Sequence, residues 1–522
     1  MLIERSHRVR IGAVVVVVLG VCLGNSAVPA TAKQSESQRG PTTNQVIVKL
    51  RGDAAARMDA GQQRAAVASV AARAGHSLEY RFDHGGGVHT LRLSGEAPES
   101  DVQSVAAELA RDPRVAYAEP DWIMRHTAST PNDSSFGQQW SLQAVSPSNF
   151  GIDAPRAWDI ERGDAGIVVA VIDTGYRPHA DLAGRFVPGY DFVDYDFGTA
   201  ALSANDGDGR DADAQDPGDW ITAMEDASGY FSGCGASPSS WHGTHVAGII
   251  GAATNNGVGV AGVNWGSKIL PVRVLGKCGG FTSDIVDGMR WAAGLPVPGA
   301  PANPNPAHVI NLSLGGSSSC SATYQNAIDE ITAAGVAVVV AAGNSNGPVG
   351  SPANCSGVIA VAATSRSGNR AFYSNFGSAV SVAAPGGDSD SDSKILSTLN
   401  AGLTTPGADS YAAYQGTSMA APHVAGVASL VLSVDPCVSP DALRNMLRST
   451  VTNFPAGSSC TTTTCGAGIV NAGAAVEAAQ TVLRARERES RYAGARPALP
   501  TASVDVLTPA IFRDWSSGRC YP

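Results

Sequence analysis

Three side chains in this sequence have the types and positions needed for acyl transfer. Ser418 lies within Gly416–His423, where a run of small residues turns into an apolar helix. A serine at a helix N-terminus has free backbone N–H groups beside it, which can stabilise an oxyanion. His242 opens a second small-residue helix, and Asp173 ends the apolar run Ile167–Ile172. A histidine oriented by an aspartate can take the proton of a serine and make it a nucleophile.

The elements that would hold these residues are those of an α/β fold. The run Ile167–Ile172 is apolar and β-branched, which is typical of a strand buried in the middle of a parallel sheet. Sites in such sheets form outside the carboxyl ends of the strands, where Asp173 would lie. Strands and helices alternate from Ile167 to Leu432, so we predict a doubly wound parallel sheet. Each motif alone has a plainer interpretation, because a lone histidine is often structural and a glycine–serine loop can simply cap a buried helix.

Together these motifs resemble those of the subtilisin-like serine proteases (subtilases, the peptidase S8 family), of the extracellular bacterial type with an inhibitory propeptide. The order Asp173, His242, Ser418 along the chain is the order found in subtilisin. The resemblance implies that Asp173 orients His242 and stabilises its charged form, and that Ser418 attacks the peptide carbonyl to form an acyl-enzyme. His245 and His423 fall at helical positions of the same motifs, so we expect them to be structural.

The resemblance also implies an oxyanion donor and a strand that binds substrate. Asn344 follows the apolar run Gly335–Gly343 and matches the family's amide donor, although an asparagine after a strand can also be a turn residue. The run Val309–Gly316 resembles the strand whose free edge pairs with the substrate backbone. The residues expected to bind substrate are Ser313, Leu314, Gly315, Ala342 and Gly343. The small apolar residues around Ala342 predict room for a large apolar side chain.

The N-terminal segment 1–32 has the composition of a secretory signal peptide. Three arginines precede the apolar run Ile11–Leu23, and Ala30–Ala32 offers a cleavage site of small residues. We therefore predict a secreted, extracellular protein with no membrane segment after the signal is removed.

Residues 33–126 are predicted to form a small domain of their own. Strand-like and helix-like segments follow in a βαββαβ-like order, which is typical of a ferredoxin-like α+β fold. The assigned segments are strands at 45–50, 88–93 and 114–121 and helices at 60–74 and 101–111. The domain resembles the inhibitory propeptide of the same proteases, which implies a folding catalyst and an intramolecular inhibitor. Self-cleavage is expected near 124–130, and the alternative is a permanent accessory domain.

The catalytic unit is expected to cover 127–482, with a last helix from Ala474 to about Val482. The remaining 483–522 contains a charged stretch and then a Pro/Ala-rich segment that is too short to bury a core alone. We expect this C-terminal tail to be a linker-like or processed extension.

Two regions are candidates for calcium as a structural cofactor. The insert between Asp173 and His242 contains a Gly-rich acidic loop, which predicts either a calcium site or a solvated loop. Its aspartates are Asp206, Asp208, Asp211, Asp213, Asp216 and Asp219. The resemblance implies another site, held by the side chains of Asp133, Asp181 and Asn256 and the carbonyls of Thr254, Val258 and Val260. No catalytic cofactor is expected.

The cysteine content predicts disulfides. The chain has nine cysteines, one of them in the signal segment, and an even number beyond it in an exported protein indicates pairing. The resemblance implies the pairs Cys234–Cys278, Cys320–Cys355 and Cys460–Cys465. Cys437 and Cys520 are left over, and they either pair with each other or separate when the tail is processed.

The net charge of −10, with no basic stripe, argues against nucleic-acid binding. We therefore predict a monomeric, secreted serine endopeptidase that acts on protein and peptide substrates and is made as a zymogen. One alternative is an inactive subtilase fold that only binds peptides, which the presence of all four site residues disfavours. The other is a peptide ligase, in which an amine rather than water attacks the acyl-enzyme.

Overall fold

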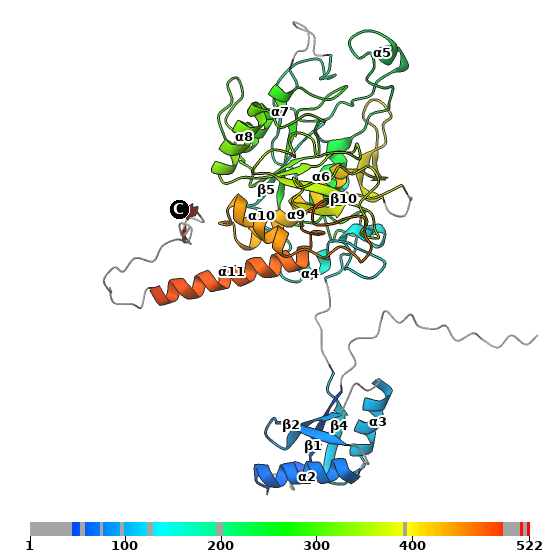
Figure 1. Ribbon diagram of the computed structural model, residues 1–522, viewed down its shortest axis with the longest axis vertical. Coiled ribbons are helices and arrows are strands. Elements are labelled where there is room, and N and C mark those ends of the chain that lie inside the picture. Colours follow the sequence, from blue (N-terminus) through cyan, green and yellow to red (C-terminus); the bar gives the residue numbers. More distant parts are fainter. Residues whose placement is uncertain are drawn as a thin grey trace, which may run out of the picture. The chain divides into compact units, whose positions relative to one another are not determined.

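The computed structural model describes residues 44–52, 58–73, 77–93, 99–122, 129–194, 202–389, 394–493, 512–514 and 519–521. The chain forms two compact units, Met1–His126 and Thr127–Pro522 (Figure 1). The predicted signal segment and most of the predicted self-cleavage region lie outside the described residues.

The first unit is a four-stranded antiparallel sheet with two helices. Its elements are β1 (Gln45–Leu50), α2 (Ala60–Arg73), β2 (Leu78–Asp83), β3 (Val88–Leu93), α3 (Glu99–Leu109) and β4 (Val115–Pro120). The sheet order β2-β3-β1-β4 is that of a ferredoxin-like fold, as predicted. Alternate residues of β1, Val46 and Val48, point into the core that the helices cover. Strand β2 was not assigned from the sequence, because it is mostly exposed and has little apolar alternation.

A seven-stranded parallel sheet forms the centre of the second unit. Its strands are β5 (Val168–Asp173), β6 (Tyr190–Asp191), β7 (Lys268–Arg273), β8 (Val309–Leu312), β9 (Ala337–Ala341), β10 (Ile359–Thr364) and β11 (Val382–Pro385). They are ordered β11-β10-β9-β8-β5-β7-β6. All neighbouring strands are parallel, and every residue of β5 is buried. The predicted doubly wound α/β fold is confirmed.

Helices cover both faces of this sheet. The described α-helices of this unit are α4 (Ala154–Trp158), α5 (Ala223–Ala227), α6 (His242–Gly251), α7 (Thr282–Ala292), α8 (Ala322–Ala333), α9 (Thr417–Val434), α10 (Pro440–Ser449) and α11 (Ala472–Ala493), of which α5 buries no residue. Val169 and Val171 of β5 pack in one core with α6 and α9, and Ala170 and Ile172 pack in another with α7 and α8. Figure 1 shows α7 and α8 on one side of β5 and α9 and α10 on the other. Side chains that alternate along one strand therefore build two separate cores.

The sheet reverses its winding direction at β5. This strand pairs with β7 on one side and with β8 on the other, so the chain builds outward from it in both directions. Ligand sites in open parallel sheets form at such a switch point, beyond the carboxyl ends of the strands. Asp173 is the last residue of β5 and lies at this point.

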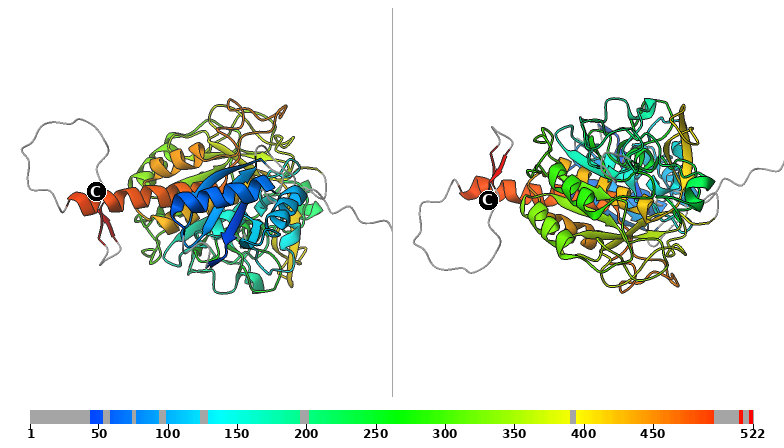
Figure 2. Two further views of the ribbon diagram at one scale, coloured as in Figure 1. Left: turned by 90° about the horizontal axis from the view of Figure 1, so that it is seen from below. Right: turned by 90° about the horizontal axis from the view of Figure 1, so that it is seen from above.

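The C-terminal helix α11 is longer than predicted. It runs from Ala472 to Ala493 and so includes most of the charged stretch that was expected to lie in the tail. Alanine, arginine and glutamate all favour helices. No glycine or proline occurs between Gly473 and Gly494, so the sequence contains no helix breaker before Gly494. Arg486 also binds Asp435 across to the body of the unit, with 2.7 Å between Nη1 and Oδ2. Figure 2 shows α11 projecting from the body in both views.

The remaining described strands form two antiparallel hairpins. They are β12 (Ile395–Asn400) with β13 (Asp409–Tyr414), and β14 (Phe512–Asp514) with β15 (Arg519–Tyr521). Among the described helices, α9 alone is long and apolar enough to cross a membrane, but 83% of it is buried inside the fold. Its apolar composition is therefore that of a core helix.

Disulfides join loops of the second unit, and three of them lie wholly within the described residues. They are Cys234–Cys278, Cys320–Cys355 and Cys460–Cys465, with Cα–Cα distances of 5.6, 5.1 and 5.4 Å. These are the pairs that the family resemblance implies. The first bond ties the insert before α6 to the loop that follows β7. The side chain of Cys520 lies outside the description, so a Cys437–Cys520 bond stays a prediction.

Candidate active site

Asp173 and His242 meet at the end of β5 and the start of α6. Oδ1 of Asp173 lies 2.8 Å from Nδ1 of His242, and Asp173 is fully buried. Glycines allow this approach: a Cβ on Gly243 would lie 2.0 Å from the carbonyl oxygen of Gly175. Gly175 has a φ of 97°, which few other residues adopt. The glycines that follow Asp173 and His242 in sequence therefore let strand and helix come close enough for the hydrogen bond.

The surroundings of His242 favour its charged form. Burial alone would lower the pKa of His242, but the charge and hydrogen bond of Asp173 outweigh it, with further help from the carboxylates of Asp219 and Asp216. The pKa of His242 is therefore raised above its ordinary value. An imidazole in this setting is well placed to take up a proton and hold it.

Ser418 is the second residue of α9 and lies against the end of β8. Its Oγ donates to the carbonyl oxygen of Ser313 at 3.1 Å, and Oγ of Ser313 donates to the carbonyl oxygen of Ser418 at 2.8 Å. A hydrogen bond between Ser418 and His242 is not among those of the described residues. Catalytic hydrogen bonds of this kind are often completed only when substrate binds.

Pro422 explains why the carbonyl of Ser418 is available. Helix α9 begins at Thr417, so Pro422 lies inside it. A proline has no N–H to bond the carbonyl four residues earlier. The hydroxyl of Ser313 takes that place, and this links the start of α9 to β8.

Asn344 follows β9 and is held by the residue before Ser418. Its Oδ1 accepts hydrogen bonds from the backbone N–H and the hydroxyl of Thr417, both at 2.9 Å. Its Nδ2 makes no hydrogen bond with the described residues and lies 3.6 Å from the position of a Cβ on Gly416. The free end of the amide is therefore its donor nitrogen, beside the segment that carries Ser418.

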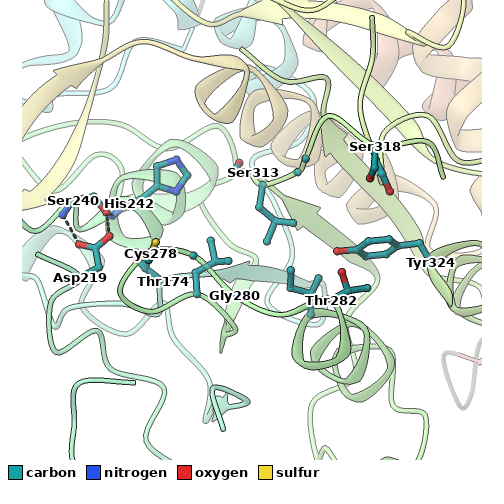
Figure 3. A pocket seen from close by; sticks show the side chains of 17 residues that line it. Thr174, Asp219, Ser240, His242, Cys278, Gly280, Thr282, Ser313, Ser318 and Tyr324 are labelled. Carbon is teal, nitrogen blue, oxygen red and sulfur yellow. Dashed lines mark hydrogen bonds between the residues drawn. The ribbon is translucent and has the colours of Figure 1, made fainter. Parts of the chain in front are cut away.

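A cleft of about 550 Å³ runs from His242 along the end of β8 (Figure 3). Ser313, Leu314 and Gly315, which the sequence predicted to bind substrate, line it. Ala342 is buried, and neither it nor Gly343 is among the lining residues of this cleft.

Several lining residues were not predicted. They are Leu275, Gly279, Gly280, Thr282 and Ile285 beyond β7, Tyr324 of α8, and Asp219 and Ser240 of the insert before α6. For the residues beyond β7 the sequence did contain a signal, which is the pair Gly279-Gly280 after that strand. The carboxyl ends of parallel strands lie at the same edge of the sheet, so a loop that follows β7 is expected near the site. The sequence carries no comparable signal for Asp219 or Tyr324.

The other two histidines of the motifs are structural, as the sequence predicted. Burial lowers the pKa of His245 to about 3 and that of His423 to about 4, so both are neutral. His245 stacks on Tyr414 with 4.6 Å between the ring centres. His423 is bonded to the carbonyl of Met419 and the hydroxyl of Ser141, at 2.7 and 2.9 Å.

The candidate calcium ligands from the resemblance lie in one loop region. The carboxylate of Asp133 accepts from the N–H of Asn255 at 2.8 Å, and that of Asp181 accepts from Val260 N–H at 2.8 Å. Both aspartates are buried, and no basic residue in the described ranges pairs with them. Burial, together with the charge of Asp181, raises the pKa of Asp133.

The oxygen atoms around these carboxylates fit a hard cation in part. The carbonyls of Thr254, Val258 and Val260 accept no hydrogen bond from the described residues. Asn256, however, turns its Nδ2 to Asp181 at 2.8 Å, while its Oδ1 accepts from Val258 N–H at 2.7 Å. Calcium prefers such carboxylate and carbonyl oxygens, but Asn256 would have to exchange these bonds to become a ligand.

The acidic insert is partly neutralised within the protein. Asp206 and the buried Asp191 both pair with Arg273. Asp216 is buried and accepts from the hydroxyl of Thr174 at 2.7 Å, and burial raises its pKa to about 7. The aspartates Asp206, Asp208, Asp211 and Asp213 line a cavity of about 270 Å³ together with Arg177. In the described part of the chain, no group of three or more acidic, histidine or cysteine side chains is arranged to hold a metal.

Comparisons with known proteins agree with this architecture. The subtilase family pattern matches residues 164–468, more than half of the chain. The chain is 49% identical over 429 residues to an extracellular protease of Xanthomonas campestris pv. campestris, which covers 80% of this chain and 69% of that protein. It is 43% identical over 392 residues to an extracellular basic protease of Dichelobacter nodosus, covering 72% of this chain and 60% of that relative.

A solved structure shares the fold. It is a protease from Pseudoalteromonas arctica, 54% identical, with a TM-score of 0.62 and coverage of 67% of this chain and 100% of that one. The likeness covers about two thirds of this chain and the whole of the solved one. The chain therefore belongs to the subtilase family and is a serine endopeptidase.

Proposed function

We propose that this chain is a secreted subtilase that hydrolyses peptide bonds through an acyl-enzyme on Ser418 and is made as a self-processing zymogen. The observation that supports the proposal is the placement of two bonded groups at the ends of the neighbouring strands β5 and β8: Asp173 with His242, and Ser418 with Ser313, next to the Thr417–Asn344 pair. Its family membership makes peptides the substrate class, and extracellular relatives support secretion.

The reaction follows from the roles of these four residues. Ser418 Oγ attacks the substrate carbonyl while His242 takes its proton, and Asp173 stabilises the resulting imidazolium. The Nδ2 of Asn344 and the N–H of Ser418 donate to the oxyanion. His242 then gives its proton to the leaving amine, which leaves an ester on Ser418. Water, activated by His242, hydrolyses that ester and restores the free serine.

Ser418 must first leave its present partner. Its Oγ donates to the Ser313 carbonyl, so formation of the Ser418–His242 hydrogen bond requires a rotation of the serine side chain. A substrate strand that binds along Ser313–Gly315 would bring the reacting carbonyl to the same place. We expect substrate binding and this rotation to be coupled.

The first unit is the proposed propeptide. Its ferredoxin-like sheet precedes the catalytic unit in the sequence, and the division of the chain into two units falls between His126 and Thr127. Cleavage in this region would release the second unit. Ser129, just beyond it, is held by the catalytic unit through a bond from its N–H to Asp159 Oδ1 at 2.7 Å.

Replacement of the nucleophile tests the proposal. Ser418→Ala should abolish casein hydrolysis and should leave the chain uncleaved near residue 126, as measured by intact mass. Ser356→Ala is the matched control, because this exposed serine lies outside the cleft. A Ser418→Ala protein that still matures by itself and cleaves casein would refute the mechanism. Product analysis with an added amine separates hydrolysis from ligation.

Calcium is proposed as a structural ion at the Asp133–Asp181 loop. Binding there would offset the repulsion of two buried carboxylates that pair with no basic residue in the described part of the chain. It has no part in the chemical steps. Removal of calcium with a chelator should shorten the thermal half-life of the wild type. The Asp181→Asn variant should have a shorter half-life than the wild type even without chelator, and the chelator should shorten it less. Equal half-lives with and without chelator would exclude this role.

A further inference from the structure

The carboxylate of Asp219 forms part of the cleft wall beside His242. It comes from the insert before α6, and its two oxygens accept from the N–H and the hydroxyl of Ser240 at 2.6 and 2.7 Å. Ser240 lies two residues before His242, and both line the cleft with Asp219 (Figure 3). The insert thus holds a carboxylate in a defined position next to the catalytic histidine.

No lysine or arginine of the described residues pairs with this carboxylate, and its titratable neighbour is His242, whose pKa it helps to raise. Among the residues that line the cleft, Asp219 is the only acidic one, and none is lysine or arginine. No ion pair of the described chain includes Asp219. Lys277 lies one residue before the lining residue Cys278, but it is buried and pairs with Glu225. A carboxylate that faces a cleft without a permanently charged lysine or arginine beside it is a recognition point for a cation.

An extended substrate bound in the cleft would bring one of its side chains close to Asp219. An extended peptide along Ser313–Gly315 points successive side chains to opposite sides. The residue whose carbonyl Ser418 attacks would turn its side chain away from His242, into the space beyond Ser313. The residue before it must then turn its side chain toward His242 and Asp219.

We propose that Asp219 recognises a lysine or arginine side chain at the second residue on the N-terminal side of the cleaved bond. The inference rests on the proposed function, because it assumes peptide hydrolysis at Ser418. It goes beyond that function by naming the class of side chain that the cleft selects. The hydroxyl and N–H of Ser240 hold the carboxylate in place for the pair.

The sequence of the chain itself agrees with this preference. If self-cleavage falls between His126 and Thr127, where the two units divide, the second residue before the bond is Arg125. The chain would then be a substrate of the proposed type. Arg125 lies outside the described residues, so this support comes from its place in the sequence alone.

Paired peptide substrates test the proposal. They differ only at the second position before the cleaved bond, which is lysine in one and the uncharged norleucine in the other. We expect the mature wild type to show about tenfold higher kcat/KM for the lysine peptide, and this ratio to fall as salt is added. In Asp219→Asn the ratio should collapse to about one. Asp329→Asn, which removes an exposed carboxylate of α8, should keep the wild-type ratio.

Two outcomes would overturn the inference. One is a wild type that cleaves both peptides equally, a measurement that needs no variant to fold. The other is an Asp219→Asn enzyme that keeps the preference for lysine. In that second case kcat/KM for both peptides changes by the same factor, so Asp219 acts only through His242, and the recognition role is wrong. An enzyme that cleaves neither peptide nor casein would instead refute the proposed function.

The chain's own processing gives a second test. Arg125→Gln should slow the appearance of the mature unit several-fold, and the same change should have no effect in an Asp219→Asn background. An effect of Arg125→Gln that is equally large in both backgrounds would show that Asp219 does not read this residue.

Discussion

The side-chain oxygen of Asn344 accepts two hydrogen bonds from Thr417, one from its N–H and one from its hydroxyl, each at 2.9 Å. The residue before the nucleophile therefore fixes the orientation of the amide, which is proposed to stabilise the oxyanion. Asn344 is exposed, so without this anchor its amide could turn freely. A donor that is held before the reaction costs no reorganisation when charge develops.

The anchor can be removed without touching the donor. Thr417→Val keeps the shape of the side chain and deletes the hydroxyl, so we expect kcat to fall about tenfold with little change in KM. Asn344→Ala removes the donor itself and should lower kcat about 100- to 1000-fold. Single-turnover kinetics on a peptide substrate would measure both.

The two changes should also be coupled. In the double variant, loss of the hydroxyl should have little further effect, because there is no amide left to orient. Thr417→Ser keeps the hydroxyl and is the control. Independent, multiplicative losses of Thr417→Val and Asn344→Ala would contradict the anchoring role.

The pH dependence of activity should report on His242. A general base must be neutral to take a proton, so kcat/KM should rise with pH and level off above the pKa of His242. Because the carboxylates around His242 raise this pKa, the midpoint should lie above the ordinary value of about 6.5.

Loss of the aspartate charge should move that midpoint. Asp173→Asn should shift it to lower pH and reduce kcat about 10,000-fold. A wild-type midpoint below 6 would show that burial outweighs the charge of Asp173. The charged form of His242 also stabilises the fold below the unfolded pKa, and this contribution is lost as pH rises through the folded pKa.

The glycine after His242 should be intolerant of any side chain. A Cβ on Gly243 would lie 2.0 Å from the carbonyl oxygen of Gly175, and neither backbone can move without displacing β5 or α6. We expect Gly243→Ala, made in the Ser418→Ala background to prevent self-digestion, to accumulate poorly or to melt far below its parent. Gly347→Ala is the control, since its nearest neighbour would be 3.8 Å away. A melting temperature of Gly243→Ala near that of the parent would refute the close approach.

The disulfides should differ in what they contribute to stability. In the chain-entropy account, a bond that closes a longer loop restricts the unfolded state more. Cys234–Cys278 spans 44 residues and Cys460–Cys465 only 5, so their removal by paired serine substitutions should cost about 4 and about 2 kcal/mol. Thermal unfolding in the Ser418→Ala background would measure the order, and a larger loss from the short loop would contradict it.

Much of the fold could be predicted because the evidence for it is local. The unbroken apolar run before Asp173 is typical of a central parallel strand, and it forms β5. The small-residue runs that begin near His242 and Ser418 form the buried helices α6 and α9. The errors came where a pattern was weak or continuous: the exposed strand β2 has no clear alternation, and nothing in the sequence ends α11 at Val482.

The chemistry of the individual residues could be read from their types and order, since a serine, a histidine and an aspartate at strand and helix ends have few other uses together. The residues that contact them could not be predicted in this way. Ser313 bonds the carbonyl that Pro422 leaves free, and Thr417 holds Asn344, through contacts between segments 73 to 105 residues apart. Asp219 lines the cleft and belongs to the acidic insert. The composition of that insert did not predict where any single aspartate would lie. Such contacts depend on how the strands and helices pack against one another, and no local pattern in the chain records that packing.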